Sequence, residues 1–280
     1  MNILFYGNCQ TFALKNILNL NSNDFNQYHI ECFSTNINKE EYDIILKKCD
    51  VIITQPISKN YREKDYLSSE YLLHNCKPNC KIIIFDSCHF DFYYFDLTYK
   101  VINGKLIDTP GHYHLNNLIY CYKNNLGQQY YIDNFINNKN LKTINELEMI
   151  AIDSLNELNS RFLKNVEYYK NNHNVIVISS HDYIKQNYKE KLLFYSMNHP
   201  TKYVLQNIGE QIIEIIKIKN TINYDLNTLD STKCVIYKCI QNVVNFNIND
   251  CELLVHNNSK IEEIVKIYYD SYNDAKIIFD

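Results

Sequence analysis

Glycine is scarce in this sequence: it occurs five times, at positions 7, 104, 111, 127 and 209. This spacing permits neither the GxGxxG turn of dinucleotide-binding enzymes nor the GxxxxGK[ST] loop of P-loop nucleoside triphosphatases. The sequence therefore argues against both of these classes of nucleotide enzyme.

A basic surplus and a long apolar run are also missing. The 280 residues carry 28 Lys and Arg against 32 Asp and Glu, a net charge of -4, whereas nucleic-acid-binding domains usually present a basic face. The longest apolar runs, such as residues 82–85 and 175–178, fall far short of the roughly 20 residues that a bilayer span needs. No basic region precedes the apolar N-terminal stretch, so no signal peptide is expected. We therefore expect no nucleic-acid partner, no membrane span and a cytoplasmic protein.

The cysteines do not form an obvious framework. Ten of them are scattered along the chain without an export signal, so free thiols are expected. The closest pairs, Cys76/Cys80 and Cys234/Cys239, have no second pair at zinc-finger spacing, and no metal site is predicted. The abundance of Asn, Ile, Lys and Tyr is typical of an AT-rich genome. If that genome is viral, the cytoplasm is that of the host.

Short β-branched runs alternate with amphipathic stretches, which predicts an α/β protein with a parallel sheet. Strands are expected at Asn2–Tyr6, Val51–Thr54, Lys81–Phe85, Val175–Ile178 and Leu192–Tyr195. Helices are expected at Thr11–Leu20, at Glu40–Lys48, at Thr143–Lys170 with a Thr143/Glu146 capping box, and from Pro200 onward. These elements predict one α/β domain over residues 1–220.

The pattern changes after residue 220, where a polar, aperiodic segment begins. Two further strands are expected at Cys234–Tyr237 and Leu253–His256, with a helix at Lys260–Tyr269. We interpret residues 221–280 as a small appended α/β element.

The tetrapeptide Gly7-Asn8-Cys9-Gln10 directly follows the first predicted strand and precedes the first predicted helix. Ligands gather at the carboxyl ends of parallel strands, and a helix N-terminus offers unpaired N–H groups. Glycine permits a tight turn, while Asn8 offers a donor and Cys9 a nucleophile. The alternative is structural: Asn8 caps the helix and Cys9 packs as a small buried residue.

A histidine stands at a second strand–helix junction, in Asn198-His199-Pro200. At the carboxyl edge of a sheet, His199 can act as a general base near neutral pH. Here too the alternative is that Asn198 and His199 only cap the following helix.

Three segments, GNCQ at 7–10, DVIITQP at 50–56 and LFYSMNHPT at 193–201, occur in this order and resemble the WcbI-like family of polysaccharide-biosynthesis enzymes. The resemblance covers residues 1–219 and does not reach 221–280. It implies an SGNH-hydrolase-like fold, a three-layer sandwich with a central, mainly parallel sheet. It also implies binding of coenzyme A and transfer of an acyl group to a sugar.

The resemblance also implies roles for individual residues. It assigns His199, Cys9 and Asn8 to catalysis. Ser196 stands three residues before His199, where SGNH hydrolases have an aspartate, so we expect the acceptor to attack a bound thioester directly. In that mechanism His199 deprotonates the sugar, and Asn8 with N–H groups of the first loop stabilises the tetrahedral oxyanion. Coenzyme A is negatively charged and needs local cations; its expected site comprises Gly7, Gln10, Gln55, Lys59, Arg62, Asn198 and Lys202.

Two weaker clusters complete the predicted site. Asp86, Ser87 and His89 follow the strand 81–85 and are expected at the same sheet edge, where they could grip sugar hydroxyls. His112 and His114 precede a predicted helix and are expected in the substrate wall.

These observations predict an acetyl-CoA-dependent acyltransferase that acts on an amino or hydroxyl group of a sugar or nucleotide-sugar. Two other functions stay open: an SGNH-type esterase or deacetylase that uses Cys9, and a non-catalytic sugar- or nucleotide-binding module. A homo-oligomer and a fused glycan-biosynthesis domain are both compatible with the sequence.

Overall fold

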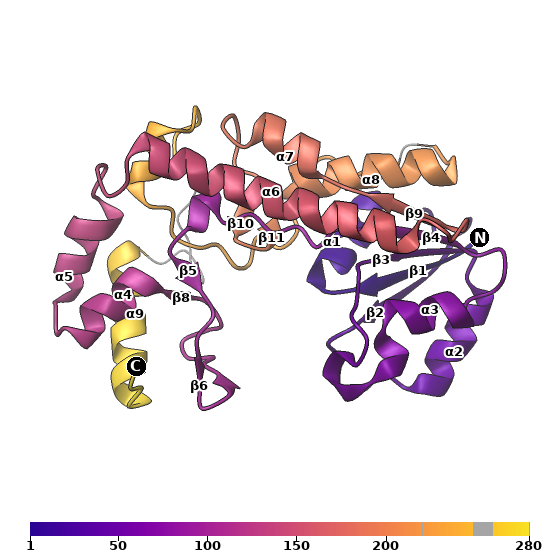
Figure 1. The fold of residues 1–280 in the computed structure, drawn as a ribbon, viewed down its shortest axis with the longest axis horizontal. Helices are drawn as coiled ribbons and strands as arrows, with labels where there is room; N and C mark the ends of the chain where they lie inside the picture. Colours follow the sequence, from indigo (N-terminus) through magenta and orange to yellow (C-terminus); the bar gives the residue numbers. More distant parts are fainter. Residues whose placement is uncertain (220, 249–259, 280) are drawn as a thin grey trace. The chain divides into compact units, whose positions relative to one another are not determined.

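The computed structural model describes residues 1–219, 221–248 and 260–279 (Figure 1). The expected strand Leu253–His256 lies outside these residues. The chain divides into two units: the first contains 1–88, 155–186 and 199–229, and the second contains 89–154, 187–198 and 230–280. Residues 221–280, expected as one appended element, thus contribute to both units.

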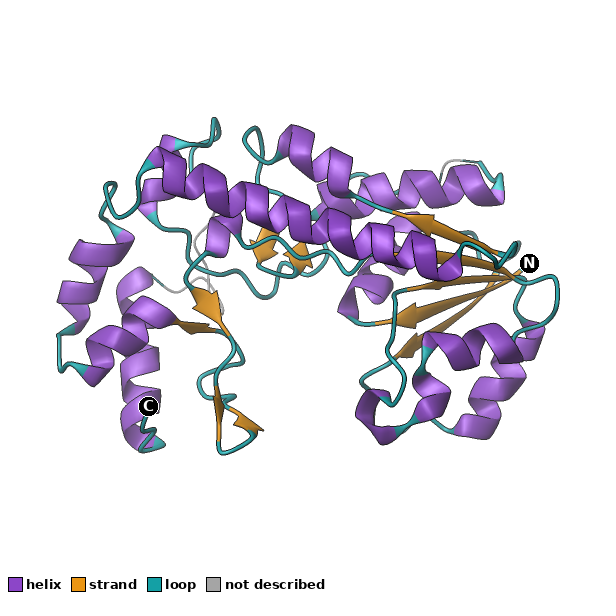
Figure 2. Ribbon diagram, viewed as in Figure 1, coloured by secondary structure: helices purple, strands orange, loops and turns teal. Residues whose placement is uncertain are grey.

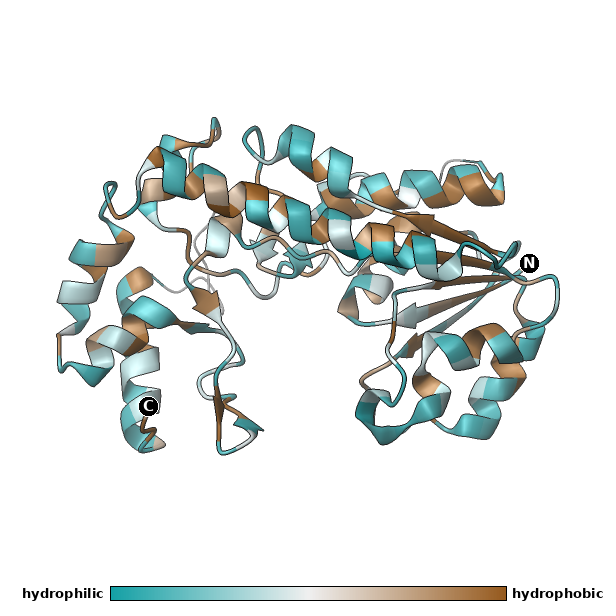
Figure 3. Cartoon of the chain, viewed as in Figure 1, coloured by the Kyte–Doolittle hydropathy of each residue, from teal (hydrophilic) through white to brown (hydrophobic). Residues whose placement is uncertain are grey.

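Five parallel strands form the central sheet of the first unit, in the order β2-β1-β3-β4-β9. They are β1 (Asn2–Gly7), β2 (Asn26–Glu31), β3 (Val51–Thr54), β4 (Lys81–Phe85) and β9 (Val175–Ile178). Four of them follow the β-branched runs of the sequence, and Figure 3 shows these strands in the hydrophobic colour. The polar edge strand β2 was not expected. The predicted α/β class with a central parallel sheet is confirmed.

Helices cover both faces of this sheet because alternate strand residues point to opposite sides. On one face, Leu4, Ile52 and Ile82 join a core with Tyr42 and Leu72, which belong to α2 (Lys39–Lys48) and α3 (Ser69–Asn75). Figure 1 shows α2 and α3 side by side below the strands. Two further helices of this unit, α1 (Cys9–Leu18) and α8 (Lys202–Ile216), pack against each other. This arrangement leaves the carboxyl ends of the strands next to the N-terminus of α1.

Two helix predictions were tested at their first residues. Thr143 and Glu146 form the expected capping box, since Thr143 N donates to Glu146 Oε2 at 2.7 Å and Glu146 N donates to Thr143 Oγ1 at 3.3 Å. This box precedes α6 (Ile144–Tyr169), which contributes residues to both units. The helix expected from Pro200 begins later, at Lys202, because Thr201 is an extended N-cap (φ -72°, ψ 172°). Pro200 instead belongs to the short strand β11 (His199–Pro200).

The second unit is built from short elements (Figure 2). They are β5 (Leu97–Thr98), β6 (Val101–Ile102), β7 (Lys105–Leu106), β8 (His114–Leu115), α4 (Asn116–Lys123), α5 (Gln128–Tyr131), β10 (Phe194–Ser196) and α9 (Ile261–Asp274). The helix expected at Lys260–Tyr269 is confirmed as α9, which extends to Asp274. The strand expected at Cys234–Tyr237 was wrong: this buried run forms no ladder and leads into a 3-10 helix at Lys238–Asn242.

The run Cys234–Tyr237 is apolar because it packs in the core of the second unit, around the buried carboxyl group of Asp96. Tyr237 is 2% exposed, and its hydroxyl donates to Asp96 and lies 2.8 Å from the Tyr131 hydroxyl. Asp96 also accepts the Asn117 N–H in the first turn of α4. The segment is therefore held by side chains that reach into the core of the second unit.

Among the described residues, no helix is long and apolar enough to cross a membrane. Every described cysteine is a free thiol.

Candidate functional site

The first loop is a tightly bonded turn between β1 and α1. Asn8 is the N-cap of α1, and its Oδ1 accepts the Gln10 N–H at 2.9 Å. Its carbonyl oxygen accepts the N–H and the hydroxyl of Thr11 at 2.9 and 2.6 Å. Asn8 therefore does cap the helix, and the loop is held in one conformation at the carboxyl edge of the sheet.

The Gln10 side chain links the loops that follow three strands. This side chain is buried, with 1% exposed; Nε2 donates to Cys88 O at 2.9 Å, and Oε1 accepts the Cys88 N–H at 3.0 Å. Gln55, after β3, donates to the same Oε1 at 3.0 Å and accepts the Asn8 N–H at 3.0 Å. The amides of Gln10 and Gln55 thus bind the loops after β1, β3 and β4 to one another. Gln10 and Gln55 were predicted as coenzyme A contacts, and the structure shows them in bonds within the protein.

Gly7 is required by close packing. A Cβ at this position would lie 2.6 Å from Thr11 Cγ2 and 2.8 Å from Gln55 Oε1. Any larger residue must therefore displace the side chain that holds the Asn8 N–H.

We expect Gly7→Ala to lower the free energy of unfolding by about 1–3 kcal/mol, the usual cost of overpacking a core. Urea unfolding of the full chain measures this change. Gly127→Ala is the matched control, because φ is -67° there and nothing lies within 4 Å of the added Cβ. Equal losses in the two variants would contradict the assignment.

Cys9, the first residue of α1, is a half-buried thiol. Burial raises its pKa, and the opposing backbone N–H groups of Cys9 and Gln10 do not reverse the shift. Because the thiolate is the nucleophilic form, this raised pKa disfavours Cys9 as a nucleophile at neutral pH.

The surroundings of Cys9 include residues that the sequence did not reveal. Glu31 and Cys32 both raise the pKa of the Cys9 thiol by their charge, and Cys32 N donates to Gly7 O at 2.8 Å. Tyr61 bonds the Cys32 side chain. Glu31 and Cys32 were missed because β2, the strand that precedes Cys32 and ends at Glu31, has no β-branched pattern. The only sequence signal for this strand is its position before the polar segment 34–36.

Three cations follow in segment 59–64, of which Lys59 and Arg62 were predicted. Burial raises the pKa of Cys32, and the charge of Arg62 opposes this shift; the Arg62 guanidinium donates to Phe33 O. Lys64 donates to Thr35 O at 3.4 Å. Lys59 forms an exposed ion pair with Glu70 at 3.9 Å. Arg62 and Lys64 therefore present two cations beside the end of β2, where an anionic ligand can be bound.

Asp86 follows β4 and is buried, with 2% exposed. Its Oδ1 accepts from Asn165 Nδ2 at 3.1 Å. Burial raises its pKa to about 6, against the opposing effects of Ser179, Asn165, Arg161 and His181. A carboxyl group with this pKa can exchange a proton near neutral pH. Ser87, the next residue, is half-buried.

This shift predicts a pH-dependent stability. The folded chain holds the Asp86 proton more tightly than the unfolded chain, whose aspartate has a pKa of about 3.9, so stability falls as pH rises from 4 to 6. Asp86→Asn lacks this titration. The free energy of unfolding of the variant relative to wild type should therefore rise by about 2–3 kcal/mol from pH 4 to pH 7. Urea unfolding across this range measures the difference, and a pH-independent difference would contradict the raised pKa.

His199 lies in β11, three residues before the first residue of α8. It belongs to the same unit as Cys9 and is half-buried. Lys202, the first residue of α8, places its ammonium 5.8 Å from the centre of the Tyr203 ring. Asn198 belongs to the second unit, where its Oδ1 accepts from Tyr113 Oη and from Ser196 Oγ at 3.2 Å.

The three other predicted histidines also belong to the second unit. His114 is 0% exposed and bonds to Tyr272 Oη at 2.8 Å and to Ile107 O at 3.2 Å, so it is a core residue. His112 is exposed, and His89 Nε2 lies 3.5 Å from Asp91. Within the described ranges, no group of three His, Cys, Asp or Glu side chains is arranged to hold a metal ion.

The comparisons with known proteins agree with the resemblance noted in the sequence. A solved structure of WcbI, described as a novel polysaccharide biosynthesis enzyme in its native form without a disulfide bond between CoA and a cysteine, is similar to this chain. The TM-score is 0.79 at 20% identity, over 98% of this chain and 90% of that chain. No curated protein sequence matches. The family model "Polysaccharide biosynthesis enzyme WcbI" matches residues 2–221, and the chain therefore belongs to the WcbI family of polysaccharide biosynthesis enzymes.

Proposed function

We propose that this protein is an acyltransferase that uses coenzyme A thioesters, acetyl-CoA above all, to acylate an amino or hydroxyl group of a sugar or nucleotide-sugar. The observation that carries the proposal is Cys9, a half-buried thiol at the N-terminus of α1. The similar WcbI structure is described in relation to a disulfide between CoA and a cysteine. We assign the corresponding position to Cys9, so that the thiol end of coenzyme A lies beside it.

The charges around Cys9 support this orientation. A helix N-terminus attracts anionic groups, and Arg62 and Lys64 provide further positive charge beside the end of β2. Phosphate groups of coenzyme A are bound by such groups, Arg62 through paired hydrogen bonds. The hydrogen bonds of the Gln10 and Gln55 side chains keep the first loop in the conformation that receives the thioester.

The proposed reaction is a direct acyl transfer. His199 takes a proton from the sugar amine or hydroxyl as that group attacks the thioester carbonyl carbon. The oxyanion of the tetrahedral intermediate is stabilised by Asn8 Nδ2, because the Asn8, Gln10 and Thr11 N–H groups already donate to Gln55 Oε1, Asn8 Oδ1 and Asn8 O. The C–S bond then breaks, and the coenzyme A thiolate takes the proton from His199. The Cys9 thiol, which burial keeps protonated, forms no covalent intermediate.

A transfer assay tests this function. The full chain is incubated with acetyl-CoA and a panel of methyl glycosides, aminoglycosides and nucleotide-sugars, while free thiol and acetylated sugar are measured separately. We expect thiol release that depends on the sugar and equals acetyl-sugar formation. Thiol release at the same rate without sugar would indicate a hydrolase, and no release with any acceptor would contradict the proposal.

A further inference from the structure

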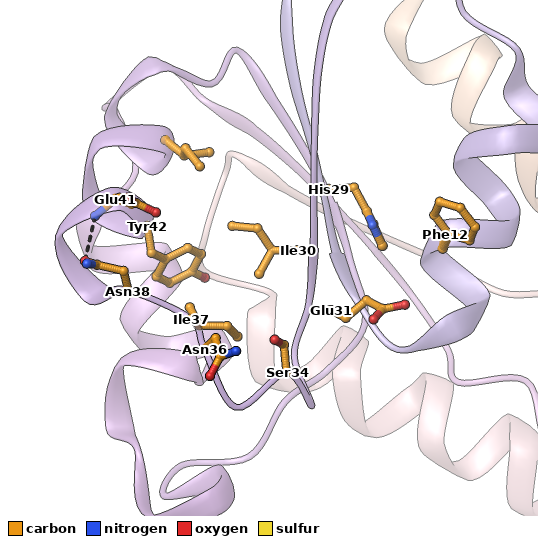
Figure 4. A pocket seen from close by; sticks show the side chains of 11 residues that line it. Phe12, His29, Ile30, Glu31, Ser34, Asn36, Ile37, Asn38, Glu41 and Tyr42 are labelled. Atoms are coloured by element: carbon orange, nitrogen blue, oxygen red, sulfur yellow. Dashed lines mark hydrogen bonds between the residues drawn. The ribbon is translucent and has the colours of Figure 1, made fainter.

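A hollow of about 550 Å³ lies at the edge strand β2 of the first unit (Figure 4). Its lining comes from α1, β2, the following loop and α2: Phe12, His29, Ile30, Glu31, Ser34, Asn36, Ile37, Asn38, Glu41, Tyr42 and Ile45. The proposed roles of the first loop and of His199 use none of these residues. A hollow of this volume can hold a small molecule.

One part of the hollow adjoins the proposed reaction site. Figure 4 shows Phe12, His29 and Glu31 on the same side of β2. Phe12 follows Cys9 by three residues on α1, so both side chains lie on one helix face. Glu31 influences the Cys9 thiol by its charge. A molecule bound on this side of β2 would therefore lie next to the proposed thioester.

The same part combines an aromatic surface with hydrogen-bond acceptors. Phe12 is 45% exposed, and its ring centre lies 5.0 Å from that of His29. His29 Nε2 is buried and has no hydrogen-bond partner within the part of the chain that the structure describes. Burial, with a smaller contribution from Lys15, lowers the pKa of His29, which keeps the ring neutral at neutral pH.

The charged side chains that line this hollow are two carboxylates, Glu31 and Glu41, with no lysine or arginine among the lining residues. On the side of Phe12, the Glu31 carboxylate disfavours a phosphate group and can accept hydrogen bonds from hydroxyl and ammonium groups. Asn36 and Asn38 lie on the other side of β2 (Figure 4), and Asn38 Oδ1 already accepts the Glu40 and Glu41 N–H groups.

We propose that the hollow at β2 binds the acceptor as an unphosphorylated sugar unit, preferably an amino sugar. Phe12 contacts the apolar face of the ring, and Glu31 accepts hydrogen bonds from its hydroxyl or ammonium groups. The assignment of this sugar as the acceptor rests on the proposed function, whereas the binding of a sugar in the hollow does not. It predicts that acceptor and coenzyme A occupy different residues of the first unit.

Saturation-transfer NMR titrations of the full chain test the site with three probes: a methyl glucosaminide, a methyl glucoside and a glucose phosphate. We expect the amino sugar to bind about fivefold more tightly than the neutral sugar, because one favourable charge contact contributes up to about 1 kcal/mol at a surface. The glucose phosphate should bind most weakly. A phosphate that binds as well as the amino sugar would overturn the proposal.

Two variants locate the binding, each with a control outside the hollow. Phe12→Ala should weaken both uncharged and amino sugars about tenfold, whereas Tyr168→Ala, which removes a side chain that is 66% exposed on α6, should not. Glu31→Gln should remove the preference for the amino sugar and leave the neutral sugar unchanged, whereas the exposed Glu40→Gln should alter neither. Equal effects of variant and control would overturn the site.

Coenzyme A titrations of the same samples separate this proposal from the proposed function. If Phe12→Ala loses sugar binding but keeps coenzyme A binding, the result supports a distinct acceptor site. If wild type binds the amino sugar but no coenzyme A, the transferase function fails while the sugar site stands. Loss of coenzyme A binding in Phe12→Ala would assign the hollow to the donor and overturn the proposal.

Discussion

Replacing His199 with alanine should lower the turnover of acetyl transfer by about 10²–10⁴-fold, the usual contribution of a general base. Cys9→Ala should lower it by less than about tenfold, because the protonated thiol is not the nucleophile in a direct transfer. The measurement is kcat from acetyl-sugar formation at saturating acetyl-CoA, with both variants and wild type in parallel. The ratio between the two variants separates base catalysis from covalent catalysis.

His173→Ala is the control for a general effect of removing an imidazole, since His173 is exposed in the same unit. It should leave kcat unchanged. An intact-mass measurement of wild type during turnover supplies an independent readout and should show no acetylated chain. The direct-transfer mechanism would be wrong if Cys9→Ala lost more activity than His199→Ala and the wild type carried an acetyl group on Cys9.

Gln10→Leu should lower the free energy of unfolding by about 3–5 kcal/mol, the range for breaking a buried hydrogen-bond network. The substitution removes the contacts of Gln10 with both backbone groups of Cys88 and with Gln55 Nε2. All three groups then stay buried without that partner. Urea unfolding, followed by circular dichroism, measures the loss.

Gln186→Leu is the matched control, because Gln186 is an exposed helical glutamine of the same unit. Its effect should stay within about 0.5 kcal/mol, as for most surface substitutions. If Gln10→Leu also changed stability by so little, the three loops would not depend on the glutamine, and the bracing role of Gln10 and Gln55 would be wrong.

The sequence predicts the centre of the sheet well because buried parallel strands are nearly continuous apolar runs. The runs at 51–54, 81–85 and 175–178 have no equally good helical interpretation, and they became β3, β4 and β9. The long helix α6 was predicted together with its first turn, because the capping box is a local signal in adjacent residues.

The elements that were missed depend on long-range contacts. The edge strand β2 has the sequence NQYHIE, and its polar residues fit an edge that is buried on one side only. The contact of Gln10 with Gln55 and Cys88 joins residues 45 and 78 positions apart, which no periodicity reveals. Cys234–Tyr237 was expected as a strand because it is apolar, but its apolar character serves the core around Asp96.

The candidate site was predicted unevenly for the same reason. Cys9 and Asn8 stand at a strand–helix junction that the sequence marks, and the structure places both there. His114 also follows a recognisable turn, but its burial against Tyr272 depends on α9, which lies far along the chain. Glu31 was hidden because its strand was hidden, although it faces both Cys9 and the hollow at β2.

Calorimetric titration of the full chain with coenzyme A and with acetyl-CoA tests the central claim most directly, when repeated on His199→Ala. The account predicts a Kd in the micromolar range for both ligands and no more than about a twofold change in the variant, because His199 is assigned to proton transfer and not to binding. The absence of binding by either ligand to the wild type would contradict the account.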